Sequence, residues 1–156
     1  MLPFKRILCP TDFSKPASVA LKRAEEMARH FSAELLVAHV IPVVPGLHTY
    51  ADPPVATSFD VPIYQQELAL FAEKQLKNLV SHHVSAQVRT RDLVVTGEAA
   101  PEILRAASQE QVDLIVIASH GESGWHRLVF GSVAEKVVRQ APCPVLTIKP
   151  PAEGGK

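Results

Sequence analysis

Hydrophobic positions along the chain follow two spacings that alternate with each other. Apolar runs of strand length occur at residues 5–9, 35–41, 88–95, 114–117 and 145–148, and such runs are typical of strands in a sheet that is covered on both faces. Between them, apolar residues recur at helical spacing from Ser14 to about residue 31, and at 63–82, 101–109 and 132–140. Ser14 is the expected N-cap of the first helix.

The order of these elements predicts the fold class. Five predicted strands alternate with four predicted helices, which is typical of an α/β protein with a parallel, doubly wound sheet and helices on both faces. Ligands of such sheets bind outside the carboxyl ends of the strands, where the strand order reverses. If the first and fourth strands are central neighbours, the turns at 10–12 and 118–121 face one crevice.

The length of the chain limits its domain organisation. Its 156 residues, of which 47% are hydrophobic, are enough for one domain with a substantial core. We expect this domain to span residues 1–150 and to be followed by a flexible tail at 151–156. Residues 42–62 include five prolines and are predicted to form a long loop. This loop is either a flap over a ligand site or a solvated connector.

Charge and cysteine content exclude several classes of function. Sixteen basic and sixteen acidic side chains cancel, so nothing indicates a nucleic-acid partner or attachment to an anionic membrane. No apolar run approaches the roughly 20 residues that span a bilayer, and the N-terminus lacks a signal-peptide pattern. Cys9 and Cys143 do not have a metal or redox spacing, and the adjacent His82 and His83 are wrongly spaced for a shared metal. We therefore expect a cytoplasmic protein whose side chains hold no metal.

The candidate chemistry lies where the fourth strand ends. Gly121 follows this strand closely, and after nine further residues Gly131 and Ser132 stand where the last helix is predicted to begin. Glycines let the backbone approach a ligand closely, and the free N–H groups of a helix start attract anions. The pattern predicts a phosphate cradle, although the glycines could serve only the geometry of the turn. No Walker lysine motif and no nucleophile–base pair occurs in one segment, so no catalytic residue is predicted.

The same residues resemble the nucleotide-binding signature of the universal stress protein family, Gly-x-x-Gly-x9-Gly-(Ser/Thr), with Ala118 at the first glycine position. Because alanine tolerates positive φ poorly, we expect the turn at Ala118 to differ slightly from that of the family. Four further stretches, at 7–14, 36–41, 97–103 and 132–146, are similar to other segments of the family. The resemblance therefore covers nearly the whole chain.

The resemblance to the nucleotide-binding branch of this family implies an adenine nucleotide alpha hydrolase-like fold with strand order 3-2-1-4-5. It implies a homodimer formed through the last strand, at Val145, Leu146, Thr147 and Ile148. It also implies that ATP or AMP is bound, with Mg²⁺ or Mn²⁺ held through the phosphates when the ligand is ATP.

Carried over to this sequence, the resemblance implies a role for each site residue. Asp12 would bond the ribose hydroxyls, the backbone of Val40 would bond adenine, and Pro10 and Thr11 would line that part of the pocket. The residues around the phosphates would be Ala118, His120, Gly121, Gly131, Ser132 and Val133.

Three of the polar residues also have structural explanations. Asp12 could cap the turn after the first strand. Ser132 could be the N-cap of the last helix, a role that is compatible with phosphate contact. We interpret His39, within the second strand, as a core or pocket-edge residue.

Together these features favour a stress-response protein that acts as a nucleotide-dependent regulatory or protective module. The occupancy of its site would alter the choice of a protein partner whose identity the sequence does not indicate. The alternatives are a weak ATP-hydrolysing enzyme and a nucleotide-free family member that acts only through protein–protein contacts.

Overall fold

Strands and helices alternate through the ranges that the computed structural model describes, which are residues 2–45, 61–120 and 130–149. The elements in chain order are β1 (Arg6–Pro10), α1 (Lys15–Phe31), β2 (Glu34–Ile41), α2 (Val61–His83), β3 (Thr90–Thr96), α3 (Ala99–Gln109), β4 (Leu114–Ala118), α4 (Ser132–Gln140) and β5 (Val145–Ile148). The predicted alternation of strand and helix is confirmed.

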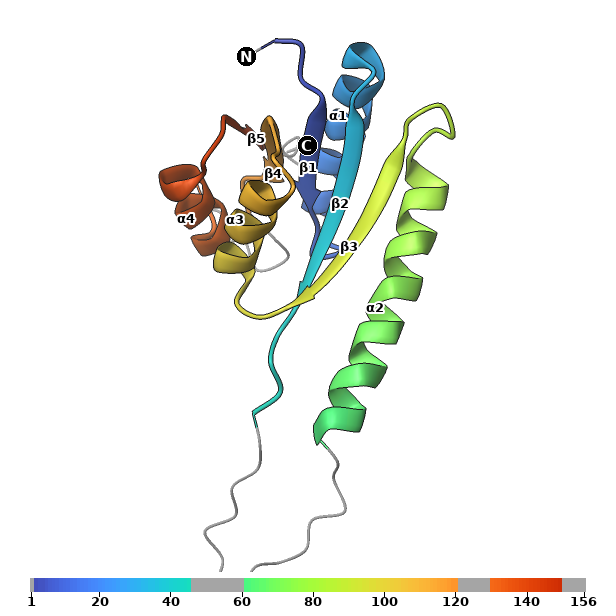
Figure 1. The fold of residues 1–156 in the computed structure, drawn as a ribbon, viewed down its shortest axis with the longest axis vertical. Helices are drawn as coiled ribbons and strands as arrows, with labels where there is room; N and C mark the ends of the chain where they lie inside the picture. Colours follow the sequence, from blue (N-terminus) through green and yellow to red (C-terminus); the bar gives the residue numbers. More distant parts are fainter. Residues whose placement is uncertain (1, 46–60, 121–129, 150–156) are drawn as a thin grey trace, which may run out of the picture.

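The strands form one parallel sheet in the order β3-β2-β1-β4-β5 (Figure 1). β1 is central, and its Ile7, Leu8 and Cys9 are completely buried because helices cover both faces of the sheet. The continuous apolar runs of β1 and β4 follow from the same arrangement, since neither face of these strands meets water. The predicted fold class and strand order are confirmed.

Two hydrophobic cores lie on opposite faces of the sheet. On one face, Leu21 of α1 and Leu76 of α2 pack with Ile7 and other side chains of the central strands. On the other face, Ile103 of α3 and Val137 of α4 pack with Leu8 and its neighbours. The chain therefore crosses from one face to the other after β3, which places α1 and α4 on opposite sides of the β1–β4 pair (Figure 1).

Helix α1 begins as its sequence predicts. Ser14 is the N-cap, and its side chain accepts a hydrogen bond from the N–H of Ala17. Pro16 lies in the first turn, where the missing N–H removes no intrahelical bond.

Three elements begin two residues away from the predicted start, and the other boundaries agree to within one residue. α3 begins at Ala99 and not at Pro101. β3 begins at Thr90 and not at Val88, because Val88 closes a turn in which its N–H donates to the carbonyl of Ser85. The Val88 side chain is nevertheless buried, which explains its strand-like pattern. α2 begins at Val61, so Pro62 lies in a first helical turn and not in the predicted loop. Most of that loop and the whole 151–156 tail fall outside the described residues.

Among the described residues, no helix combines the length and the apolar content that crossing a bilayer would require.

Candidate functional site

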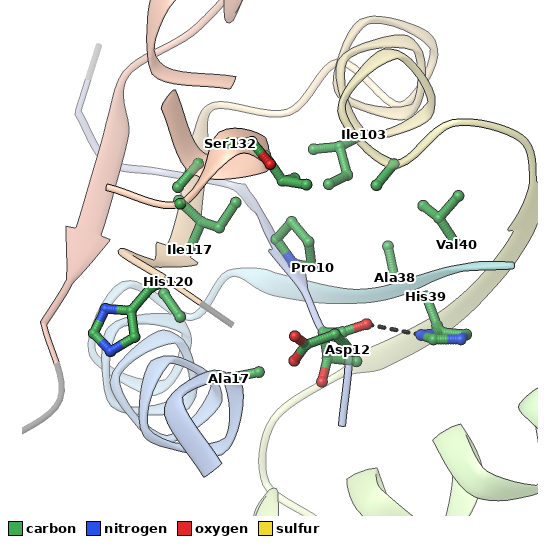
Figure 2. A pocket seen from close by; sticks show the side chains of 16 residues that line it. Pro10, Asp12, Ala17, Ala38, His39, Val40, Ile103, Ile117, His120 and Ser132 are labelled. Atoms are coloured by element: carbon green, nitrogen blue, oxygen red, sulfur yellow. Dashed lines mark hydrogen bonds between the residues drawn. The ribbon is translucent and has the colours of Figure 1, made fainter. Parts of the chain in front are cut away.

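A cavity of about 460 Å³ lies at the carboxyl ends of β1, β2 and β4, bounded by the first turns of α1, α3 and α4 (Figure 2). This is the place where the sheet order reverses, because β1 leads to a helix on one face and β4 to a helix on the other. Its volume lies within the range of roughly 300–1,000 Å³ that is usual for small-molecule sites.

The cavity brings together the site residues that were predicted from the sequence, apart from Gly121, which lies outside the described residues. The nominated residues that line it are Pro10, Thr11, Asp12, Val40, Ala118, His120, Gly131, Ser132 and Val133. His39, interpreted from the sequence as a core or pocket-edge residue, also lies in its wall.

Several apolar lining residues were not nominated from the sequence. These are Ala17, Ala38, Ala99, Ile103, Ile117 and Ala134. Ala38 could have been found, because side chains two residues apart on a strand share a face, and Val40 was already nominated. Ile103 lies on the inward stripe of α3, but its place at the cavity follows only from the packing of α3 over β2. Together these side chains form an apolar wall that suits a flat ring system.

The turn after β1 is held by hydrogen bonds to neighbouring backbone and side-chain groups. The N–H of Thr11 donates to the carbonyl of Ala38 at 2.8 Å, which joins the ends of β1 and β2. The N–H of Phe13 donates to Thr11 Oγ1 at 3.1 Å, and the N–H of Ser14 donates to Asp12 Oδ1 at 3.0 Å. Phe13 has a φ of 64°, a left-handed conformation that is uncommon for a residue with a side chain.

Asp12 therefore has the turn-capping role that the sequence left open. One of its carboxylate oxygens makes that bond, and the residue is otherwise exposed at the cavity (Figure 2). Since a carboxylate has two oxygens and about four lone-pair positions, capping leaves acceptors for a ligand hydroxyl.

His39 connects the same turn to β2 (Figure 2). Its Nδ1 lies 2.8 Å from the carbonyl oxygen of Thr11, and because a carbonyl only accepts, Nδ1 is the donor. In the neutral imidazole, Nε2 is then left as an acceptor. The ring also lies against Phe13, with ring centroids 4.3 Å apart, so both its orientation and its tautomer are fixed.

On the opposite side of the cavity, α4 begins without a side-chain cap. Its N-cap is Gly131, which has an extended backbone and no side chain to accept a hydrogen bond. The sequence alternative that made Ser132 the N-cap is wrong, because the Gly131 carbonyl accepts the first intrahelical bond, from Glu135. The N–H groups of residues 132–134 precede that bond and have no intrahelical acceptor. These residues line the cavity, and free N–H groups at a helix start are an arrangement that attracts anions.

Gly131 is favoured by the space around it and not by its dihedral angles. Its N–H donates to the carbonyl of Ser119 at 2.7 Å. A Cβ atom at Gly131 would lie 3.3 Å from His120 Cα and 3.6 Å from the Ser119 carbonyl oxygen. Its φ of −74° is open to any residue, so the close approach of α4 to the end of β4 is what favours glycine here.

Ala118 does not have the positive φ that alanine tolerates poorly. It ends β4, where it is paired with Ile148. The described non-glycine residues with positive φ are Phe13, Ser32 and Gln111. Ala118 is not one of them, so alanine here introduces no left-handed strain.

The electrostatics of the cavity depend mainly on backbone groups. Asp12 is the only acidic residue among the described lining residues, and that lining includes no lysine or arginine. Positive potential therefore comes from the N-terminal ends of α1, α3 and α4, which all border the cavity. Cys9, in the strand below, is completely buried, and burial raises the pKa of its thiol to about 12. Its thiolate form is thus disfavoured, as expected of a buried thiol and not of a nucleophile.

His120 lines the cavity two residues after the end of β4. Its Nδ1 is 3.0 Å from Ser119 Oγ, and it is half-buried in the cavity wall (Figure 2). Residues 121–129, between Gly121 and the start of α4, lie outside the described residues.

This arrangement can be compared with known proteins. A sequence model described as the universal stress protein family matches residues 3–149. The chain is 32% identical to universal stress protein MJ0531 of Methanocaldococcus jannaschii, over 95% of this chain and 84% of that protein. The solved structure of hypothetical protein MJ0577, from the same organism, is similar with a TM-score of 0.75 and 27% identity, covering 96% of this chain and 99% of that one.

A further solved structure is that of the universal stress protein from Archaeoglobus fulgidus in complex with dAMP. It has a TM-score of 0.61 and 25% identity, and the match covers 96% of this chain and 100% of that one. Because the family model matches residues 3–149 and the chain is 32% identical to the Methanocaldococcus protein, the chain belongs to the universal stress protein family.

Proposed function

We propose that this protein binds an adenine nucleotide in the cavity at the ends of β1 and β4 and acts as a nucleotide-dependent regulatory or protective module. The observation that carries the proposal is the uncapped start of α4 at Gly131, which faces an apolar cavity with the Asp12 carboxylate in its wall. The similarity to the Archaeoglobus fulgidus protein solved with dAMP supports an adenine nucleotide as the ligand.

Each part of a nucleotide has a matching partner in this proposal. The base lies against the apolar wall that includes Ala38 and Ile103 and bonds the backbone of Val40. The ribose hydroxyls donate to the Asp12 oxygen that does not cap the turn. The phosphates accept from the N–H groups at the start of α4, near Ser132 and Val133.

A divalent ion fits this site only as part of the ligand. Asp12 is the single carboxylate of the described lining, and dedicated Mg²⁺ sites commonly combine carboxylates with phosphate oxygens and water. Mg²⁺ or Mn²⁺ would therefore enter with ATP, held by its phosphates. It would neutralise phosphate charge there, while the residues of the chain orient the base and the ribose.

The experiment that tests this function is denaturation of the purified protein with identification of any released small molecule by mass spectrometry. It is combined with calorimetric titration of the emptied protein with ATP, ADP and AMP, with and without Mg²⁺. Released adenine nucleotide or saturable binding supports the proposal, and the absence of both contradicts it. Phosphate release from ATP, measured alongside, separates a binding module from the weak hydrolase.

We further propose that the protein forms a homodimer through β5. The described residues pair β5 with β4 on one side only, and Leu146 is 38% exposed. An open apolar edge strand tends to pair with another chain. Replacing Leu146 with lysine places charges on that edge and should convert dimers to monomers in sedimentation velocity. An unchanged dimer would exclude β5 as the interface.

A further inference from the structure

Helix α2 presents hydrophobic side chains on the face that points away from the sheet. Leu70 is 58% exposed and Phe71 is 60% exposed, although both lie in the middle of a 23-residue helix. The opposite side of the helix, with Ala72 and Leu76, is the side buried against β2 and β3. α2 lies along one margin of the molecule (Figure 1), and no other described helix or strand covers its outer face.

This surface, which we call the α2 outer face, consists of Glu67, Leu70, Phe71 and Lys74. At about 3.6 residues per turn these four positions share one side of the helix. All four are exposed. Neither Glu67 nor Lys74 makes an ion pair within the described part of the chain. The face therefore combines an apolar centre with one acidic and one basic flank.

The order of these charges suits a second copy of the same helix. When two identical helices pack antiparallel across a two-fold axis, each residue on one side of the crossing point meets a residue equally far on the other side. If the crossing point lies between Leu70 and Phe71, Glu67 and Lys74 are each about one turn, or roughly 5 Å, from it. Glu67 of each copy then lies level with Lys74 of the other.

We propose that the α2 outer face is a self-association surface through which two copies of this chain pack α2 against α2 in antiparallel orientation. Leu70 and Phe71 form the apolar centre, and two symmetric Glu67–Lys74 ion pairs flank it. A parallel arrangement would place like charges level with each other, so the pattern selects the antiparallel one. A single helix pair is a small interface, so the association is weak and depends on protein concentration.

This surface is separate from β5, because α2 packs on β2 and β3 at the other end of the sheet. Two self-complementary surfaces on one chain produce tetramers or longer chains of dimers. The inference is independent of nucleotide binding, and Leu146→Lys provides a background in which pairing through β5 is removed.

The test is sedimentation velocity over a range of concentrations on the full chain carrying Leu146→Lys. We expect a monomer–dimer equilibrium that Glu67→Lys and Lys74→Glu each weaken at least about tenfold, since each change replaces two attractions by two repulsions. An equimolar mixture of the two single variants should restore association, because a mixed dimer regains both ion pairs. The double variant Glu67→Lys/Lys74→Glu should also associate.

The matched control is Glu73→Lys, which makes the same change of charge on an exposed position of α2 outside this face. The dissociation constant of this control should stay within about twofold of the parent's value, because the changed charge lies away from the contact. Thermal unfolding of every variant should match that of the parent, because all the changed positions on α2 are exposed. A monomer at all concentrations, or a mixture that does not regain association, would overturn the proposal.

Discussion

Two of the three helices that begin at the candidate site, α1 and α4, begin in opposite ways. At the start of α1, the Ser14 side chain accepts from the N–H of Ala17, and Asp12 in turn accepts from the N–H of Ser14. At the start of α4, Gly131 offers no side chain, and the first N–H groups remain without an acceptor from the helix or its cap. Both starts border the same cavity.

The difference separates a helix start that stabilises the fold from one that is available to a ligand. A serine, threonine, aspartate or asparagine cap stabilises a helix by about 1 kcal/mol relative to alanine. α4 lacks a side-chain acceptor at its cap, which for glycine costs only about a few tenths of a kcal/mol relative to serine, and its glycine also allows the close approach to Ser119 and His120. Three substitutions test this comparison. One is at Gly131, at the start of α4, and two are at Asp12 and Ser14, before the start of α1.

The largest expected effect follows from Gly131→Val. A Cβ atom at Gly131 would make a tight contact of 3.3 Å with His120 Cα. Valine adds two methyl groups to that contact, so we expect the start of α4 to shift away from the end of β4. Loss of two well-placed hydrogen bonds to phosphate weakens AMP binding about a hundredfold, as measured by calorimetry. The AMP affinity of the control variant Gly131→Ala should lie between the affinities of the valine variant and the parent, because alanine adds only the Cβ atom. Parental affinity in the valine variant would exclude the α4 start as the phosphate site.

A smaller effect is expected from Asp12→Asn. The amide oxygen can still accept from the N–H of Ser14, so the turn is kept while the charge and one acceptor are removed. Loss of a charged hydrogen bond to the ribose weakens AMP binding by about tenfold. Calorimetry with AMP and dAMP measures this, and the preference between the two should shrink. Equal affinities in the parent and the variant would leave Asp12 with only its role in the turn.

The smallest expected effect on ligand affinity comes from Ser14→Ala, which removes the side-chain cap at the start of α1. Removing the acceptor for the N–H of Ala17 should lower the free energy of unfolding by about 1 kcal/mol while AMP affinity stays within about twofold. Urea unfolding and calorimetry measure the two quantities on the same preparation. A large loss of affinity with unchanged stability would contradict the assignment of Ser14 to the fold alone.

Most of the fold was predictable because burial acts on every strand in the same way. The uninterrupted apolar runs of β1 and β4 follow from coverage on both faces. The strand order came from the family resemblance and not from hydrophobic spacing, since spacing does not encode which strands are neighbours. Val88 shows the limit of the pattern, because a buried side chain at the end of a turn has the same hydrophobicity as one in a strand.

The candidate site was predictable where chemistry depends on residue type, and less so where it depends on packing. Asp12 and Gly131 are recognisable from residue type, because a carboxylate accepts from hydroxyl groups and glycine lets the backbone approach a ligand closely. Ile103 and Ala17 reach the cavity only because α3 and α1 begin beside it. The assignment of the cap of α4 to Ser132 failed for a related reason, since serine is favoured at N-caps generally and the contact with His120 that favours glycine is long-range.

The network of hydrogen bonds around Thr11 has a consequence for the entropy of binding. Thr11 is tied to Ala38 and His39, and Phe13 and Ser14 are tied back to the same turn, with no ligand involved. Fixing one backbone residue costs about 1–2 kcal/mol in conformational entropy, and here that ordering accompanies folding and not the arrival of a ligand. A ligand in this cavity would therefore meet one wall whose conformational freedom is already lost before it arrives.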